Sequence, residues 1–190
     1  MDIEIDITHT QLETERLRLR TWQDSDLQDF YEYSSVPGVG EMAGWKHHES
    51  MDSSREILQA FILENSSFAI VHKEDNKVIG SIGFKPSWTN DDPAFSDFTA
   101  KEIGYALAKD YWGHGLMVEA ARAVINFCFH EHALDIVTCG HFLSNHQSQR
   151  VIEKLGFQYV KTSDDYAAQL QKTFPTKKYI LFHPLQKNEA

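Results

Sequence analysis

The stretch that decides the fold runs from Ala100 to Ala121, where Ile103-Gly-Tyr-Ala-Leu107 is followed closely by Tyr111-Trp-Gly-His-Gly-Leu-Met117. The first segment is apolar enough for a strand, and apolar residues then recur at helical spacing, which predicts a helix over about 115–132. Glycine lets the turn between them approach a ligand closely, and the helix N-terminus presents unpaired N–H groups with a partial positive charge. The unit therefore predicts either a site for an anionic group such as phosphate or a tight turn that binds nothing.

Two common phosphate-binding motifs do not fit this turn. No Gly-Lys-Ser/Thr follows the glycines, which argues against the P-loop of nucleotide triphosphatases. The third glycine of the dinucleotide-binding fingerprint is also missing, because Val118 and Glu119 occupy that region.

Hydrophobic periodicity predicts the other elements on both sides of this unit. Helices are expected at about 24–35, from 53 onwards and at 147–154, with Asp24 as an N-cap and Ser53-Ser-Arg-Glu56 as a capping box. Strands are expected at 17–21, 68–71, 78–84, 103–107, 136–139, 157–160 and 178–182. The order βααβββαβαββ predicts a single α/β (α+β) domain with a mixed, mostly antiparallel central sheet flanked by helices.

Length and composition set broad limits. At 190 residues, of which 42% are hydrophobic, the chain can build one domain with its own core. It has no run of ~18 apolar residues and no secretory signal, so we expect a cytoplasmic protein with no membrane partner. The formal charge of −10 disfavours a nucleic-acid partner. Cys128 and Cys139 lie in apolar stretches and are expected to be buried free thiols.

Ten histidines raise the question of a metal site. Their clusters in the sequence are His47-His48 and His130-x-His132, and neither has a third ligand at helical spacing. We therefore expect no metal, and we interpret the two clusters as exposed loop and helix-end residues.

A second motif is Asn145-His-Gln-Ser-Gln-Arg-Val-Ile-Glu-Lys-Leu-Gly-Phe157. Together with the 100–121 unit it resembles the acetyl-CoA motifs of the GCN5-related N-acetyltransferase (GNAT) superfamily. The opening Leu12-Glu-Thr-Glu-Arg-Leu-Arg-Leu-Arg20 resembles the branch of the ribosomal-protein alanine N-acetyltransferases. The resemblance covers about residues 12–183 and implies that this core has the GNAT fold. We therefore expect a single domain over residues 1–190, with flexible ends outside the core.

The resemblance also implies acetyl-CoA as co-substrate and places its binding site. In that family the strand splays from its neighbour and bonds the pantetheine arm, while the glycine turn cradles the pyrophosphate. The matching residues here are Tyr105, Ala106 and Leu107 for the arm, Gly113, His114, Gly115, Leu116, Met117 and Val118 for the pyrophosphate, and Asn145 and Ser148 in the second motif. Met117 is bulkier than the family's usual Gly or Ala, which is tolerated if its side chain points into the core.

The resemblance is less direct for the catalytic residues. A tyrosine elsewhere in the family gives a proton to the leaving thiolate, but Ile152 stands at that position. Ser148 is the expected substitute, unless it only caps or lines the first turn of its helix. Glu102 is the expected general base, unless it is an ordinary exposed strand residue. His141, next to Gly140 where other members carry a Glu, is either a base or structural.

The sequence thus predicts an acetyl-CoA-dependent N-acetyltransferase that works by direct attack in a ternary complex. The acceptor is expected to be the amine of a protein N-terminus or of a small molecule, in a pocket shaped by the loops 41–48 and 88–98. A monomer or a homodimer is expected. The alternative is a CoA-binding module that has lost catalysis.

Overall fold

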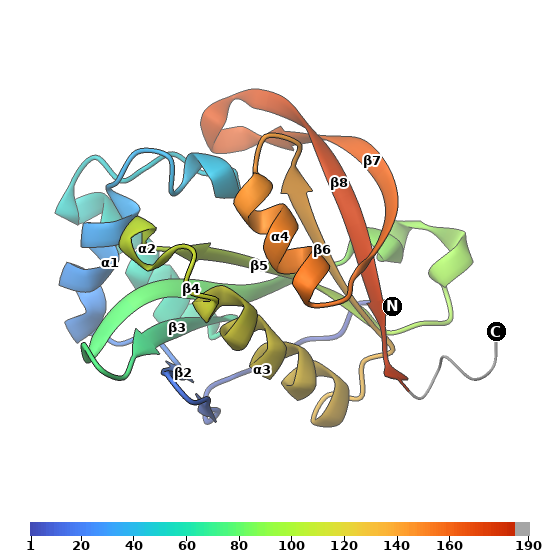
Figure 1. The fold of residues 1–190 in the computed structure, drawn as a ribbon, viewed down its shortest axis with the longest axis horizontal. Helices are drawn as coiled ribbons and strands as arrows, with labels where there is room; N and C mark the ends of the chain where they lie inside the picture. Colours follow the sequence, from blue (N-terminus) through green and yellow to red (C-terminus); the bar gives the residue numbers. More distant parts are fainter. Residues whose placement is uncertain (185–190) are drawn as a thin grey trace.

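The computed structural model describes residues 1–184, which form one eight-stranded sheet with helices on both faces (Figure 1). The strands are β1 (Leu12–Glu13), β2 (Leu17–Arg20), β3 (Ser67–His72), β4 (Lys77–Pro86), β5 (Ala100–Leu107), β6 (Ile136–Phe142), β7 (Gln158–Ala167) and β8 (Lys172–Phe182). The α-helices are α1 (Leu27–Ser34), α2 (Met51–Glu64), α3 (Leu116–His130) and α4 (His146–Lys154). The sheet order is β1-β2-β3-β4-β5-β6-β8-β7, and among these strands only β5 and β6 run parallel. The predicted mixed, mostly antiparallel sheet is confirmed.

The parallel strands β5 and β6 pair only at their beginnings. Residues 100–102 pair with 136–138, and beyond that β5 continues against β4 while β6 continues against β8. Each strand therefore has an unpaired backbone edge facing the other across a gap. This is the expected splay, and it lies in the middle of the sheet.

Alternation along the strands divides the side chains between two cores. On one face, Ile103 and Cys139 belong to the apolar cluster that includes Val124 of α3. On the other face, Phe30 of α1 and Leu58 of α2 cover the strands. The sheet is therefore packed against α3 on one face and against α1 and α2 on the other.

The N-terminal residues, which were expected to form a flexible segment before residue 12, pack against the first core. Ile5 and Ile7 are buried with the α3 cluster, and the Met1 carbonyl accepts a hydrogen bond from the Ala100 N–H at 3.1 Å. The alternating isoleucines of this acidic segment supply the apolar side chains that hold it. Residues 185–190, which include the rest of the expected flexible C-terminal end, lie outside the described residues.

Two helix starts differ from the sequence prediction. The capping box of α2 is formed by Ser50 and Ser53, not by Ser53 and Glu56, because the Ser50 side chain accepts the Ser53 N–H. Asp24 does not cap α1: a 3-10 turn, Asp24–Asp26, precedes this helix. Both helix starts contain several serine or aspartate residues within a few positions. The local sequence pattern does not show which of them is the N-cap.

The hairpin of β7 and β8 is longer than the predicted 157–160 and 178–182. Its pairing extends to Ala167 and Lys172. Most of β7 is exposed and polar, so the hydrophobic pattern carries no signal for it. The hairpin brings residues 165–169 beside the splay.

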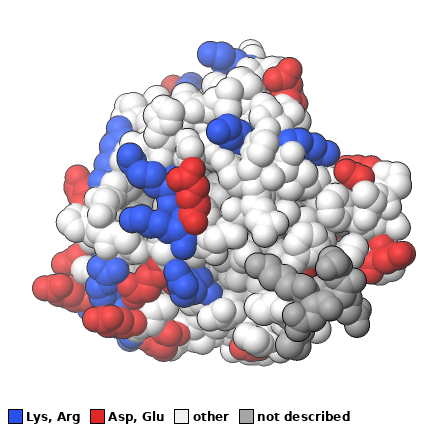
Figure 2. Space-filling view, turned by 45° about the vertical axis from the view of Figure 1, so that its right-hand side comes forward, with Lys and Arg blue, Asp and Glu red and all other residues white. Residues whose placement is uncertain are grey.

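No helix within residues 1–184 is long and apolar enough to cross a membrane. On the face drawn in Figure 2, acidic side chains lie beside the basic ones.

Candidate active site

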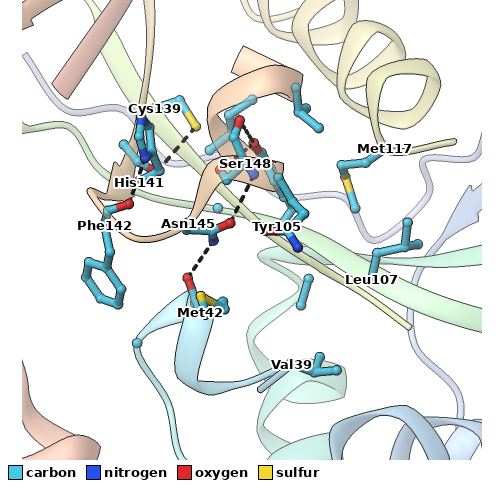
Figure 3. Close-up of a pocket in the computed structure, with 18 of the residues that line it drawn as sticks. Val39, Met42, Tyr105, Leu107, Met117, Cys139, His141, Phe142, Asn145 and Ser148 are labelled. Atoms are coloured by element: carbon cyan, nitrogen blue, oxygen red, sulfur yellow. Dashed lines mark hydrogen bonds between the residues drawn. The ribbon is translucent and has the colours of Figure 1, made fainter. Parts of the chain in front are cut away.

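A cavity of about 640 Å³ opens at the gap between β5 and β6. Tyr105 and Cys139 line it from the α3 face of the sheet, and Glu102 and Gly104 line it from the other face. The cavity therefore passes through the sheet where the two strands separate. Figure 3 shows Tyr105 and Ser148 turned toward each other in its wall.

Most of the residues predicted to bind the co-substrate line this cavity. They are Tyr105, Ala106, Leu107, Gly113, Gly115, Leu116, Met117, Val118, Asn145 and Ser148. His114 is not among the lining residues: its side chain is exposed, and its carbonyl accepts a hydrogen bond from Arg16 Nη1 at 3.0 Å. Its place in the turn is thus held from outside the cavity.

The turn before α3 has a backbone that favours glycine. Gly113 and Gly115 have φ values of 84° and 79°, in the left-handed region where a Cβ is disfavoured. No side chain caps the helix at Gly115, so the first N–H groups of α3 have no side-chain cap. Met117, at 5% exposure, belongs to the main core, as its size requires.

Ser148 is not the cap of α4. Asn145 is the N-cap, because its Oδ1 accepts the Ser148 N–H at 3.0 Å. The Ser148 hydroxyl instead lies 2.9 Å from the Tyr105 hydroxyl. Burial raises the pKa of Tyr105 well above its ordinary value, so this phenol stays protonated.

Asn145 also connects α4 to the loop on the other side of the gap. Its Nδ2 donates to the Met42 carbonyl at 2.9 Å. That loop is held by Glu41, which accepts from the Gly38 N–H at 2.6 Å and pairs with His47 at 2.7 Å. Burial opposes ionisation of Glu41, but these hydrogen bonds outweigh it and lower its pKa to about 2.

Glu102 is buried, at 4% exposure, and is not an ordinary exposed strand residue. Its Oε1 lies 2.9 Å from Nζ of Lys85, its cross-strand partner on β4. Burial lowers the pKa of Lys85, but the charge of Glu102 and its hydrogen bond reverse this, so the net pKa is raised. The carboxylate therefore faces the cavity already paired.

His141 lines the cavity, but both of its ring nitrogens have protein partners. Nδ1 lies 2.8 Å from the Phe142 carbonyl, which can only accept, so Nδ1 carries the hydrogen. Nε2 lies 3.1 Å from the Tyr179 hydroxyl. Burial lowers the pKa of His141, which favours the neutral ring. These contacts favour the structural interpretation of this residue.

Both cysteines are free and buried, as predicted. Cys139 lines the cavity, and burial raises its pKa to about 12, with the Glu102 charge as a second cause. Such a thiol is a poor nucleophile near neutral pH.

Five charged residues that were not predicted from the sequence also line the cavity: Lys85, Arg150, Lys154, Asp165 and Lys178. The spacing of Arg150 and Lys154, four residues apart on an amphipathic helix, places them on one face and was a usable signal. The pairing of Lys178 with Asp165 depends on the hairpin and has no local signal.

Two expectations about loops and histidines need correction. None of residues 88–98 lines the cavity, whereas Met42, Ala43 and Gly44 of the 41–48 loop do. Trp88, Phe95 and Phe98 instead pack in a chain of aromatic contacts that ends at Phe182. His48 is buried and not exposed. Among residues 1–184, no group of three or more His, Cys, Asp or Glu side chains could hold a metal ion.

Comparisons with known proteins agree with this geometry. The family model described as an acetyltransferase (GNAT) domain matches residues 16–158. The chain is 26% identical over 178 residues to YoaA, an uncharacterized N-acetyltransferase of Bacillus subtilis (strain 168), with 91% of this chain and 97% of that protein covered.

Solved structures share the fold at lower identity. A GNAT-family acetyltransferase from Bacillus anthracis superposes with a TM-score of 0.78 at 20% identity, covering 92% of this chain and 99% of that one. RimL, a ribosomal L7/L12 alpha-N-protein acetyltransferase in complex with coenzyme A, superposes with a TM-score of 0.73 at 16% identity, covering 91% and 98%.

Proposed function

This chain belongs to the GNAT family and is an acetyl-CoA-dependent acetyltransferase, and we propose that its acceptor is a primary amine that attacks the thioester directly in a ternary complex. The observation that carries the proposal is the cavity through the splay. It is lined from both faces of the sheet, so the two substrates can meet from opposite sides.

The residues on the α3 side fit acetyl-CoA. Beyond residue 102, β5 has no strand partner on the side that faces β6, so its backbone there can hydrogen-bond the pantetheine amides. The N–H groups from Gly113 to Val118 suit a pyrophosphate. Arg150 and Lys154 bring two positive charges to the cavity, and neither takes part in an ion pair among the described residues. The structure of RimL, which has this fold, contains coenzyme A, and this supports the proposal.

Acetyl-CoA supplies the acetyl thioester. The amine nitrogen forms a bond to the acetyl carbon as the carbon–sulfur bond breaks, so nitrogen must lose a proton and sulfur must gain one. Glu102 takes the proton from the amine in this proposal, directly or through water; its support is that the carboxylate lines the cavity on the face of the sheet away from α3. Ser148 gives its hydroxyl proton to the sulfur and is reprotonated from water.

Tyr105 positions the Ser148 hydroxyl in this scheme. A buried phenol with a raised pKa keeps its proton and can donate it as a hydrogen bond to Ser148 Oγ. The hydrogen of Ser148 is then free to point into the cavity. Serine is a weak acid, so its contribution depends on this placement.

The proposal is tested by mixing the protein with acetyl-CoA and a panel of primary amines and following free thiol, while calorimetry measures CoA binding. Turnover on at least one amine, with acetylated product detected by mass spectrometry, is the expected result. CoA binding without turnover would support the inactive CoA-binding module, and absence of CoA binding would contradict both.

A further inference from the structure

Four charged side chains line the cavity on the face of the sheet away from α3. They are Lys85 on β4, Glu102 on β5, Lys178 on β8 and Asp165 on β7. In the sheet order β4-β5-β6-β8-β7, two strands lie on each side of β6, and each of these four strands contributes one charge. The signs alternate across the sheet as positive, negative, then positive, negative.

The strand register shows that the first three side chains share a face. Lys85 is the cross-strand partner of Glu102, Glu102 pairs with Thr138, and Thr138 pairs with Ile180. Cross-strand partners point to the same face, and so do residues two apart on one strand. Lys178, two residues before Ile180, therefore lies on the face of Glu102.

The four charges form two ion pairs. Nζ of Lys85 lies 2.9 Å from Oε1 of Glu102, and Nζ of Lys178 lies 2.5 Å from Oδ2 of Asp165. The charge of Asp165 also acts on Lys85, so the two pairs belong to one network. Glu102 and Lys178 are buried at 4% and 7% exposure. A ligand group that pairs with one member of an ion pair leaves the other member without its counter-charge. When that other member is buried, the ligand must supply a second charge to pair with it, because an uncompensated buried charge is costly.

Room for such a ligand exists beside Glu102. Gly104, two residues further along β5 on the same face, has no heavy atom within 4 Å of the place where a Cβ would stand. The whole cavity measures about 640 Å³ and must also hold the pantetheine arm. The acceptor side therefore suits a small molecule.

We propose that the acceptor is a small zwitterion of the free α-amino acid class, with its ammonium group facing Glu102 and Asp165 and its carboxylate facing Lys85 and Lys178. The inference rests on the proposed function, which requires only a primary amine. A zwitterion can exchange the two internal ion pairs for two ion pairs with itself, so no charge is left alone. An amine without an anionic group, such as a protein N-terminus with a neutral first residue, would leave the two lysines without partners.

The test compares each of the common α-amino acids with its α-amide, because the amide keeps the amine and the side chain and loses only the carboxylate. We expect kcat/KM for the best amino acid to exceed that of its amide by about tenfold or more. Equal or faster turnover of amides, simple alkylamines or peptides would overturn the inference and leave the proposed function intact. Failure of every acceptor would contradict both.

Variants test the assignment of residues. In Lys178→Gln the ratio of the two kcat/KM values should fall toward one, and in Lys178→Arg it should largely remain. Lys177→Gln is the matched control, because Lys177 is the neighbouring residue, does not line the cavity and should leave the ratio as in the wild type. Unchanged CoA affinity shows that each variant is folded. If Lys178→Gln does not fold, Lys85→Gln carries the same expectation at a more exposed position, and an unchanged ratio in the folded variant overturns the inference.

Discussion

The hydroxyl of Tyr105 on β5 lies 2.9 Å from Oγ of Ser148 on α4, so the two walls of the cavity meet through one hydrogen bond (Figure 3). Asn145 caps α4, so the Ser148 hydroxyl is not needed as the cap of the helix N-terminus. The bond therefore relates the chain's two co-substrate motifs at the point where the thioester is expected to react.

Removing the Ser148 hydroxyl tests its role as proton donor. Ser148→Ala should lower kcat by about 10²-fold, the lower end of general acid catalysis, because serine is a weak acid. CoA affinity should stay within about twofold, since Asn145 still caps the helix. Steady-state kinetics and calorimetry measure the two quantities; unchanged kcat would show that Ser148 is not the donor.

Tyr105→Phe tests positioning through the same bond. The ring still packs, but the hydroxyl is lost, so kcat should fall by about fivefold to tenfold, the worth of one hydrogen bond. The effect should vanish when Ser148 is already Ala, because the bond is then absent in both proteins. Tyr159→Phe removes an exposed hydroxyl and serves as the control. An equal loss from Tyr105→Phe in the Ser148→Ala background would contradict a role through Ser148.

Gly115→Ala should weaken CoA binding through the backbone of the turn. Its φ of 79° disfavours a Cβ by about 1–2 kcal/mol, so the turn should shift and the Tm should fall by about 2–8 °C. Gly156→Ala is a matched control: its φ is 85°, its Cβ would also meet no clash, and it does not line the cavity. Both variants should lose Tm, but only Gly115→Ala should raise the Kd for CoA. An equal change of Kd in the two variants would contradict binding of the pyrophosphate by the turn at Gly115.

Arg150 and Lys154 should contribute charge to CoA binding. Each exposed charge is worth about 0.5 kcal/mol, so the double variant Arg150→Gln/Lys154→Gln should bind CoA about fivefold more weakly at low salt. Salt screens such interactions, so the difference should shrink at high ionic strength. Arg122→Gln, an exposed arginine of α3 outside the cavity lining, should leave the Kd unchanged. Calorimetry at two salt concentrations measures this, and a Kd that stays at the wild-type value in the double variant would place both residues outside the binding site.

The buried His48 should make stability depend on pH. Burial, and then the neighbouring His47, lower its pKa. The unfolded chain therefore takes up a proton near pH 6.5, where folded His48 does not. Because the unfolded state binds more protons, the free energy of unfolding should decrease as pH falls below about 6.5.

Thermal unfolding at pH 7.5 and pH 5.5 measures this effect. The Tm should be lower at pH 5.5, and His48→Gln should reduce the difference. Some difference should remain, because burial also lowers the pKa of His141. His9→Gln, at an exposed position, is the control that should retain the full difference. An undiminished difference in His48→Gln would contradict the assignment.

The sequence predicted the parts of the site whose signals are local. Gly113 and Gly115 mark the turn because a positive φ favours glycine, and the apolar period from Leu116 marks the helix behind it. The sequence could not identify Ser50 as the cap of α2, because Ser53 offers a similar local pattern. Nor could it locate the aromatic side chains of residues 88–98, since aromatic residues in a loop pack in a core as readily as they line a cavity.

The sequence by itself determined the order of strands and helices, and with it a mixed sheet with one crossover. It also determined the glycine turn before α3. Both follow from hydrophobic periodicity and backbone geometry, which act over a few residues. Only the tertiary structure decided which charges line the cavity on the face away from α3. Glu102 meets Lys85 and Asp165 meets Lys178 through strand register and a polar hairpin, and the two pairs lie on opposite sides of β6 in the sheet. Such pairings follow from how strands align in space, and no period in the sequence records them.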